Sequence, residues 1–188
     1  MTSMPFGSLW IPVIVSAIAV FVASFLVHMV LKYHNADHRK LPNEDAIRDA
    51  LGKANLEPGV YFTPFCTHAQ MKDPAVVAQF EKGPVAIVTS YPKGMPMMPK
   101  HLALWFGLCL LVSFTAAYIA RHTLHFGEGG MLAMQITGAV AFAGYGYGQI
   151  SDSIWKGQPW GTTFRHLLDC AIYGVVTGLV FKVLWPAA

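Results

Sequence analysis

Residues 9–31 read LWIPVIVSAIAVFVASFLVHMVL, and none of them is Lys, Arg, Asp or Glu. An α-helix of this length is about 34 Å long at ~1.5 Å per residue, which is enough to cross a hydrocarbon core of ~30 Å. No Lys or Arg precedes the run, and it is longer than the apolar part of a typical secretory signal. We therefore expect a retained membrane helix.

Three further apolar segments follow, at about 102–120, 131–150 and 165–185. The last is the weakest, because only residues 170–181 lie between Asp169 and Lys182. It spans a bilayer only if Arg165 and Lys182 reach the two interfaces; the alternative is a helix lying partly in the interface. We predict an all-α integral membrane protein, a polytopic bundle of four transmembrane helices.

The chain is poor in charge. Only 12% of its 188 residues are charged, against roughly 25% in soluble domains, as expected for a chain solvated largely by the lipid bilayer. The formal net charge of +3 is small, and we therefore expect no nucleic-acid partner.

The Lys and Arg residues near the helix ends predict the orientation. With four spans, one side carries Lys32, Arg39, Lys40, Lys93, Lys100, Lys156 and Arg165. The other side carries only Arg121 and Lys182. The positive-inside rule makes the first side cytoplasmic, so that residues 33–100 are cytoplasmic and both termini periplasmic, in a bacterial inner membrane.

These segments divide the chain into residues 1–32, 33–100 and 101–188. The middle part predicts a small α+β insertion that alternates helix and strand, at residues 43–54, 60–63, 73–82 and 85–89, before a proline-rich linker. Asp73-Pro74 has the form of an N-cap followed by proline at the first helical position. About 50 ordered residues make a marginal core, so we expect this insertion to contact the membrane domain or a partner.

Two pairs of glycines are spaced four residues apart in the last two segments. They are Gly144 and Gly148, and Gly174 and Gly178. Small residues at this spacing let helix backbones approach closely in lipid. We predict helix packing at these positions, within one chain or between copies.

Two histidine pairs have spacings that a metal ion can use. His34 and His38 lie four residues apart on the expected extension of the first helix, and His122 and His125 lie three apart. The predicted topology places the pairs on opposite sides of the membrane, so they cannot share one ion. The alternative for each pair is an exposed face at the interface.

Another set, His28, His101 and His166, falls near the cytoplasmic ends of three predicted spans. Two histidines on facing helices can ligate a b-type haem. The alternative is that these side chains meet water or lipid headgroups. A haem or a metal ion at the histidines is the one kind of cofactor that the sequence suggests.

Asp169 is the most costly residue to place in a membrane, and its carboxylate needs a partner, water or a proton. Arg165, four residues earlier, is the nearest candidate, and His166 is the second. Asp169 is then either part of a buried pair with Arg165 or a proton or ion site.

No catalytic constellation stands out, and the sequence favours a non-enzymatic role. The first hypothesis is a structural or accessory component of a membrane complex, bound to a protein partner or to a second copy. The alternatives are a histidine-ligated metal or haem redox protein and a small oligomeric transporter of ions or protons that uses Asp169.

Overall fold

The structure is a computed structural model that describes residues 5–125 and 127–186. It divides into two compact units. The helical unit is Met1–His38 with Met97–Ala188, and the loop unit is Arg39–Pro96. The first six residues of the predicted insertion, 33–38, thus belong to the helical unit.

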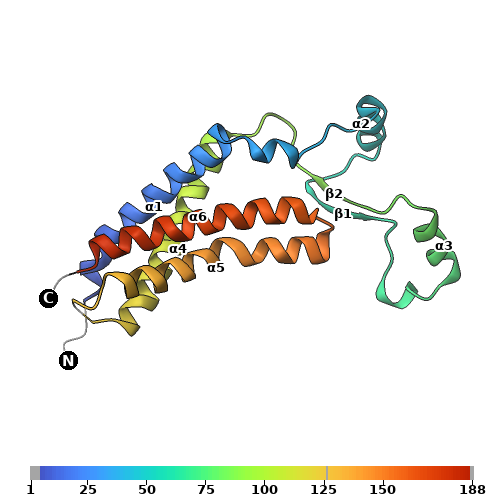
Figure 1. Ribbon diagram of the computed structural model, residues 1–188. Helices are drawn as coiled ribbons and strands as arrows, with labels where there is room; N and C mark the ends of the chain where they lie inside the picture. Colours follow the sequence, from blue (N-terminus) through green and yellow to red (C-terminus); the bar gives the residue numbers. More distant parts are fainter. Residues whose placement is uncertain (1–4, 126, 187–188) are drawn as a thin grey trace. The chain divides into compact units, whose positions relative to one another are not determined.

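The helical unit is built from long helices (Figure 1). They are α1 (Trp10–Phe25), α4 (Met98–Thr123), α5 (Met131–Lys156) and α6 (Trp160–Leu184). A 3₁₀ turn (Phe6–Leu9) precedes α1, and a π-helical turn (Leu26–Val30) follows it. Three stretches are long and apolar enough to cross a membrane, namely Phe6–Val30, Met98–Thr123 and Trp160–Leu184. This confirms three of the predicted spans by length and composition, including the weak last one.

The predicted span at 131–150 lies inside α5, which is not among those three stretches. Its length is sufficient, but its composition is less apolar. Gln135 and the glycine–tyrosine run at 144–148 lower the mean hydropathy of the helix. A fourth span therefore stays a prediction.

Helix α1 turns small side chains inward together with Val13 and Val20, and turns most of its larger apolar side chains outward. Ser16 and Ala17 are fully buried, whereas Ile18 and Val22 are about half exposed. The Ser113 hydroxyl of α4 donates to the Ser16 hydroxyl at 3.2 Å. Close contact through small residues is typical of helices that pack in lipid, where large apolar side chains gain nothing by turning inward.

Helices α5 and α6 approach closely at glycines. A Cβ atom built at Gly174 would lie 2.9 Å from the carbonyl oxygen of Gly138, and one at Gly178 would lie 2.6 Å from that of Met134. Both distances are too short for a real side chain. The predicted pair on α6 thus lies against α5, and its counterpart Gly138 was not predicted.

The predicted glycine pair on α5, Gly144 and Gly148, makes no comparably close contact with α6. A Cβ at Gly144 would meet Val112 of α4 at 3.4 Å, whereas one at Gly148 would have no atom within 4 Å. Gly144 therefore lies at an ordinary contact with α4, and Gly148 makes no close approach to any other described residue.

At one end of the helical unit, the start of α1 lies near the end of α6, as Figure 1 also shows. There a buried cluster includes Leu9, Leu124, Ala133 and Trp185. We call this the terminal end. Since α4 finishes and α5 begins at this cluster, α5 carries the chain to the opposite end, where α6 begins. We call that opposite end the site end.

The loop unit contains α2 (Glu44–Lys53), β1 (Gly59–Thr63), a 3₁₀ turn (His68–Gln70), α3 (Pro74–Lys82) and β2 (Ala86–Ser90). The strands pair antiparallel, with Gly59 opposite Ser90. The predicted order of helix and strand is confirmed, and the Asp73 carboxylate accepts from the Ala75 backbone N–H at 2.9 Å as an N-cap should. No side chain from Arg39 to Pro96 is fully buried.

Candidate metal centre

The chain reverses sharply after α1. The π turn is closed by the Leu31 N–H, which donates to the Leu26 carbonyl at 3.2 Å. Lys32 then adopts a left-handed backbone with φ of 53°, and a 3₁₀ turn, Tyr33–Ala36, follows. The predicted helical extension through His34 and His38 is therefore wrong, because the helix ends before either residue.

This reversal brings Tyr33 and His34 onto Asp169 of α6. The Asp169 side chain is only 3% exposed. The Tyr33 hydroxyl donates to its Oδ1, and Nε2 of His34 lies 2.8 Å from its Oδ2. Burial and the bond to the carboxylate raise the pKa of Tyr33, so this hydroxyl stays protonated and donates.

Two more imidazoles approach the same carboxylate oxygen. Nε2 of His28 and Nδ1 of His166 each lie 3.9 Å from Oδ2 of Asp169. The His28 ring stacks on the His34 ring with centroids 4.5 Å apart, and the His166 ring lies 5.0 Å from that of His34. Three imidazoles therefore surround one buried carboxylate. We call these residues, with Tyr33, Asp37 and Arg165, the His–Asp cluster.

The predicted Arg165–Asp169 pair is replaced by a different one. Arg165 Nε donates to Oδ1 of Asp37 at 2.7 Å, and a second guanidinium nitrogen donates to the same atom. Burial alone would raise the pKa of Asp37, but hydrogen bonds from Arg165, His34 and Thr162 outweigh it and lower the pKa to about 2. Asp37 is therefore ionised at neutral pH.

The hydrogen bonds fix which ring nitrogens carry protons. His28 Nδ1 lies 3.0 Å from the Ser24 carbonyl oxygen, and His34 Nδ1 lies 2.6 Å from Oδ2 of Asp37. Both oxygens can only accept, so both Nδ1 atoms are protonated. In a neutral ring the Nε2 atom then carries a lone pair, and both of these lone pairs are on the side of Asp169.

A lone pair of His34 Nε2 and a lone pair of Asp169 Oδ2 cannot face each other at 2.8 Å without a proton or a metal ion between them. Either of the two atoms can carry the proton, and a metal ion can take its place. Within the described residues, no Lys or Arg lies within ion-pair distance of Asp169, and the side chains that approach its Oδ2 are histidines. The position between His34 Nε2 and Asp169 Oδ2 can therefore hold a proton or a metal ion.

Two overlapping triplets bring three ligand atoms within 4.8 Å of one another. They are His28, His34 and Asp169, and His34, Asp37 and His166. Arg165 already neutralises Asp37 in the second triplet, and a guanidinium repels a metal ion. Asp169, the carboxylate of the first triplet, forms no ion pair with Lys or Arg among the described residues, so we take the first triplet as the better metal site.

The remaining predicted histidines lie elsewhere. His38 and His101 are exposed and belong to neither triplet. His122 packs its ring on Tyr118, and His125 lies just after α4, near the terminal end. Of the predicted haem set, His28 and His166 both lie 3.9 Å from Oδ2 of Asp169, whereas His101 lies outside the cluster. A haem at these histidines stays a prediction.

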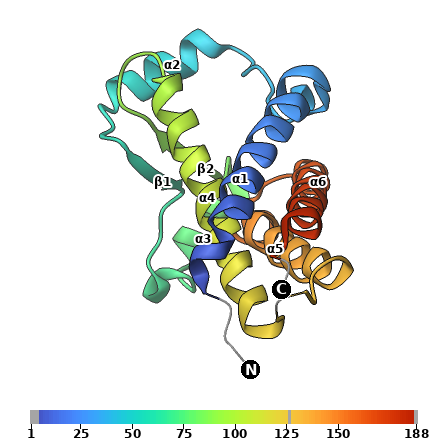
Figure 2. The same cartoon turned by 90° about the vertical axis from the view of Figure 1, so that its left-hand side faces the viewer.

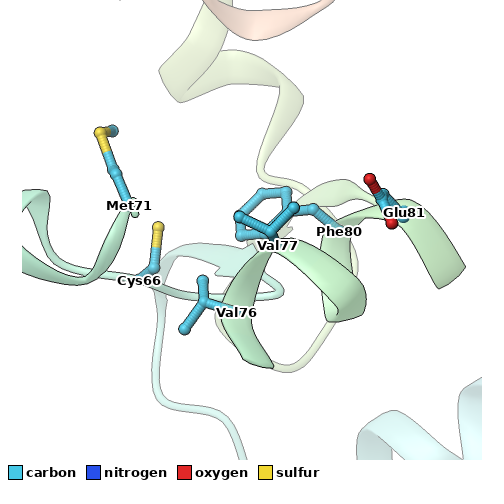
Figure 3. Close-up of a pocket in the computed structure, with 6 residues that line it drawn as sticks. All are labelled: Cys66, Met71, Val76, Val77, Phe80 and Glu81. Atoms are coloured by element: carbon cyan, nitrogen blue, oxygen red, sulfur yellow. The ribbon is translucent and has the colours of Figure 1, made fainter. Parts of the chain in front are cut away.

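The loop unit has a separate apolar pocket of about 370 Å³. Figure 3 shows its lining side chains, which come from α3 and from the segment before it: Cys66, Met71, Val76, Val77, Phe80 and Glu81. It offers one thiol and one carboxylate among apolar groups. No residue of the His–Asp cluster lines it.

No protein-family model, no curated protein and no solved structure matches the chain. The fold and the cluster define a helical protein with three candidate membrane spans and a site at which imidazoles surround a buried carboxylate.

Proposed function

We propose that this chain is a membrane protein that binds a first-row divalent metal ion through Nε2 of His28, Nε2 of His34 and a carboxylate oxygen of Asp169. One observation carries the proposal. Both histidines have Nδ1 bonded to an oxygen acceptor, while both Nε2 atoms approach Oδ2 of the same buried Asp169.

The distances suit a metal ion. Bonds of about 2.0–2.2 Å bring the ligand atoms of one ion roughly 3 to 4 Å apart. His34 and His28 lie 2.8 and 3.9 Å from Asp169 Oδ2. Metal-ligating histidines usually donate their other N–H to a carboxylate or a backbone carbonyl, which orients the ring. Asp37 and Ser24 supply these acceptors here.

Two imidazoles and one carboxylate leave coordination positions open. Such a set is typical of non-haem iron(II) sites, and imidazole with carboxylate also suits zinc. A bound ion would therefore be able to accept a further ligand. This supports the redox or metal hypothesis over a purely structural one. Ion transport through Asp169 is less well supported, since Tyr33 and His34 already bond that carboxylate.

The test is metal stoichiometry on the full chain, purified in mild detergent without chelator from metal-replete cells. We expect about one ion per chain, measured by inductively coupled plasma mass spectrometry. After metal removal, titration with Co²⁺ should restore a visible ligand-field band. His34→Ala and Asp169→Asn should lose both signals.

Matched variants separate the site from nonspecific histidine binding. His38→Ala and His122→Ala remove histidines outside the cluster and should keep the ion. His28→Ala should lose the ion, whereas His166→Ala should retain it if the first triplet is the site. Wild-type protein that binds Co²⁺ no more tightly than Asp169→Asn refutes the proposal.

We further propose that α5 is a fourth span and that both ends of the chain lie on the periplasmic side of a bacterial inner membrane. The support is connectivity: if α4 and α6 cross, α5 must cross too, because it joins the end of α4 to the start of α6. The proposed orientation rests on the Lys and Arg bias. In a Cys109→Ser, Cys170→Ser background, Cys66 should resist an impermeant maleimide in intact spheroplasts and react after lysis.

An accessory role remains a second candidate, and one observation favours it. The loop unit exposes large apolar side chains, among them Val60, Phe65, Tyr91 and Met95, and has no fully buried residue. Two strands with so little burial need further packing. Co-purification of a stoichiometric second polypeptide, lost when Phe65 and Tyr91 are changed to Ser, would support this role. A monodisperse single chain would contradict it.

A further inference from the structure

The segment that leads into α4 is exposed along its whole length and carries both apolar and basic side chains. It reads PKGMPMMPK at residues 92–100, and we call it the entry segment. Each of its residues is exposed, and the exposed fractions of Met95, Met97 and Met98 are 91%, 65% and 60%. Three large apolar side chains exposed within four residues mark a candidate contact surface.

The entry segment is continuous with a candidate membrane span. Helix α4 begins at Met98, and the apolar stretch that could cross a bilayer is Met98–Thr123. Consecutive Cα atoms are ~3.8 Å apart, so Met95 can lie no farther than about 11 Å from Met98. If α4 crosses a bilayer, the lipid headgroup layer is therefore within reach of all three methionines.

The backbone of the entry segment suits a membrane surface. No helix or strand occupies residues 91–97. Pro92, Pro96 and Pro99 have no backbone N–H, so three donors that would need a partner in a less polar environment are missing. Methionine side chains are flexible and polarizable and adapt to irregular surroundings. The segment can thus enter a headgroup layer without first breaking regular structure.

The distribution of charge favours an anionic surface. Residues 43–90 hold six acidic and four basic side chains, whereas residues 91–101 hold two lysines and no Asp or Glu. Lys93 and Lys100 are exposed, and neither forms an ion pair with a described residue. Lysines next to a membrane span are attracted to anionic lipids. Both lysines are therefore available to lipid phosphates.

A third lysine follows another candidate span at the same end of the helical unit. Figure 2 shows α1 and α4 side by side, with the end of α1 and the light-green start of α4 toward the same end. Lys32 comes two residues after the first candidate span and is exposed. Arg165 already pairs with Asp37, and Lys156 with Asp152. Neither carboxylate is therefore left to neutralise Lys32.

We propose that the entry segment docks on the surface of an anionic phospholipid bilayer, with its three methionines in the headgroup layer and Lys93 and Lys100 at lipid phosphates. This docking rests on the proposed crossing of the membrane by α4 and not on the proposed metal ion. It holds the junction between the loop unit and α4 at the membrane surface.

The test compares the full chain in nanodiscs of phosphatidylcholine alone and of equal parts phosphatidylcholine and phosphatidylglycerol. Dilute hydrogen peroxide oxidises exposed methionines, and mass spectrometry gives the rate at each one, with Met71, 57% exposed, as the internal reference. Two lysines at about 1 kcal/mol each favour the anionic bilayer by about 30-fold. Phosphatidylglycerol should therefore slow the oxidation of Met95 and Met97 by up to that factor, and high salt should reverse the effect.

Paired lysine variants test the electrostatic part. Lys93→Gln with Lys100→Gln should remove the dependence on phosphatidylglycerol. Lys53→Gln with Lys82→Gln removes the same charge from exposed positions that do not flank a span, and should keep it. Equal oxidation rates in the two bilayers overturn the docking. Protection that persists in a neutral detergent without lipid also overturns it, because a protein contact would then cover the methionines.

The same samples separate the docking from the proposed function. A chain that enters nanodiscs and binds a metal ion, but shows no dependence on phosphatidylglycerol, overturns the docking alone. Protection that depends on phosphatidylglycerol, in a chain that binds no metal ion, supports the docking and refutes the metal proposal. A chain that enters neither kind of nanodisc refutes the membrane crossing of α4 and the docking with it.

Discussion

His34 Nδ1 lies 2.6 Å from Oδ2 of Asp37, and this contact determines that the opposite nitrogen of His34 faces Asp169. Asp37→Asn removes a charged acceptor and releases Arg165. Loss of such an outer partner typically weakens metal binding 10–100-fold. We therefore expect Asp37→Asn to lower the affinity for Co²⁺ or Zn²⁺ by about 10–100-fold without abolishing it, measured by competition with a chromophoric chelator.

The control for this change is Asp152→Asn. Asp152 forms an exposed ion pair with Lys156 at 2.7 Å, and exposed pairs of this kind contribute little. Its metal affinity should equal that of the wild type. If Asp37→Asn behaves like Asp152→Asn, Asp37 does not position His34 for a metal ion.

Lys32 gives a second prediction, because its φ of 53° is unusual for a residue with a side chain. Lys32→Gly should keep metal binding and raise the free energy of unfolding by up to about 1 kcal/mol, since glycine adopts this backbone without strain. Lys32→Val removes the same charge but disfavours the turn. It should lower the melting temperature and weaken metal binding; equal behaviour of the two variants would show that the turn is unimportant.

Part of this site could be predicted from the sequence. The sequence predicts His28, His101 and His166 near the same end of three spans; the structure brings His28 and His166 to Asp169 and leaves His101 outside the cluster. Tyr33 and Asp37 were missed, and Arg165 was assigned to the wrong carboxylate. Helical spacing can only pair residues of one helix, and it therefore favoured Arg165 with Asp169. The partner actually used lies 128 positions away in the chain.

The signal for the chain reversal was weak for a physical reason. Gly and Asn are the usual residues at left-handed positions, and Lys32 is neither. The charge-free runs in the sequence identified the three candidate spans, because a helix that crosses a bilayer must be made largely of apolar residues. The same criterion is weak for α5, where close packing on α6 requires small residues such as Gly138, which are less apolar.

Tyr173 provides a third prediction, from the core of the helical unit. Its hydroxyl is buried and has no hydrogen-bond partner within the described residues, and an unpaired buried polar group costs about 1–3 kcal/mol. Tyr173→Phe removes only that hydroxyl and should leave the melting temperature in detergent unchanged or raised. Tyr33→Phe removes a hydroxyl that bonds Asp169 and should lower it. A strong loss of stability in Tyr173→Phe would indicate that a partner occupies this hydroxyl.

Gly178 and Gly148 give the last prediction, because Gly178 is tightly packed against α5 and Gly148 has open space around it. A Cβ at Gly178 would lie 2.6 Å from the Met134 carbonyl oxygen, and neither backbone can move without separating α5 from α6. Overpacking of this kind costs about 1–3 kcal/mol, so Gly178→Ala should lower the melting temperature and the folded yield. A Cβ at Gly148 meets nothing within 4 Å, and alanine favours the helix by about 1 kcal/mol. Gly148→Ala should therefore be neutral or stabilising in a monomeric preparation. A destabilised Gly148→Ala would instead indicate that this glycine faces a second copy or another protein, and would strengthen the accessory role over the metal proposal.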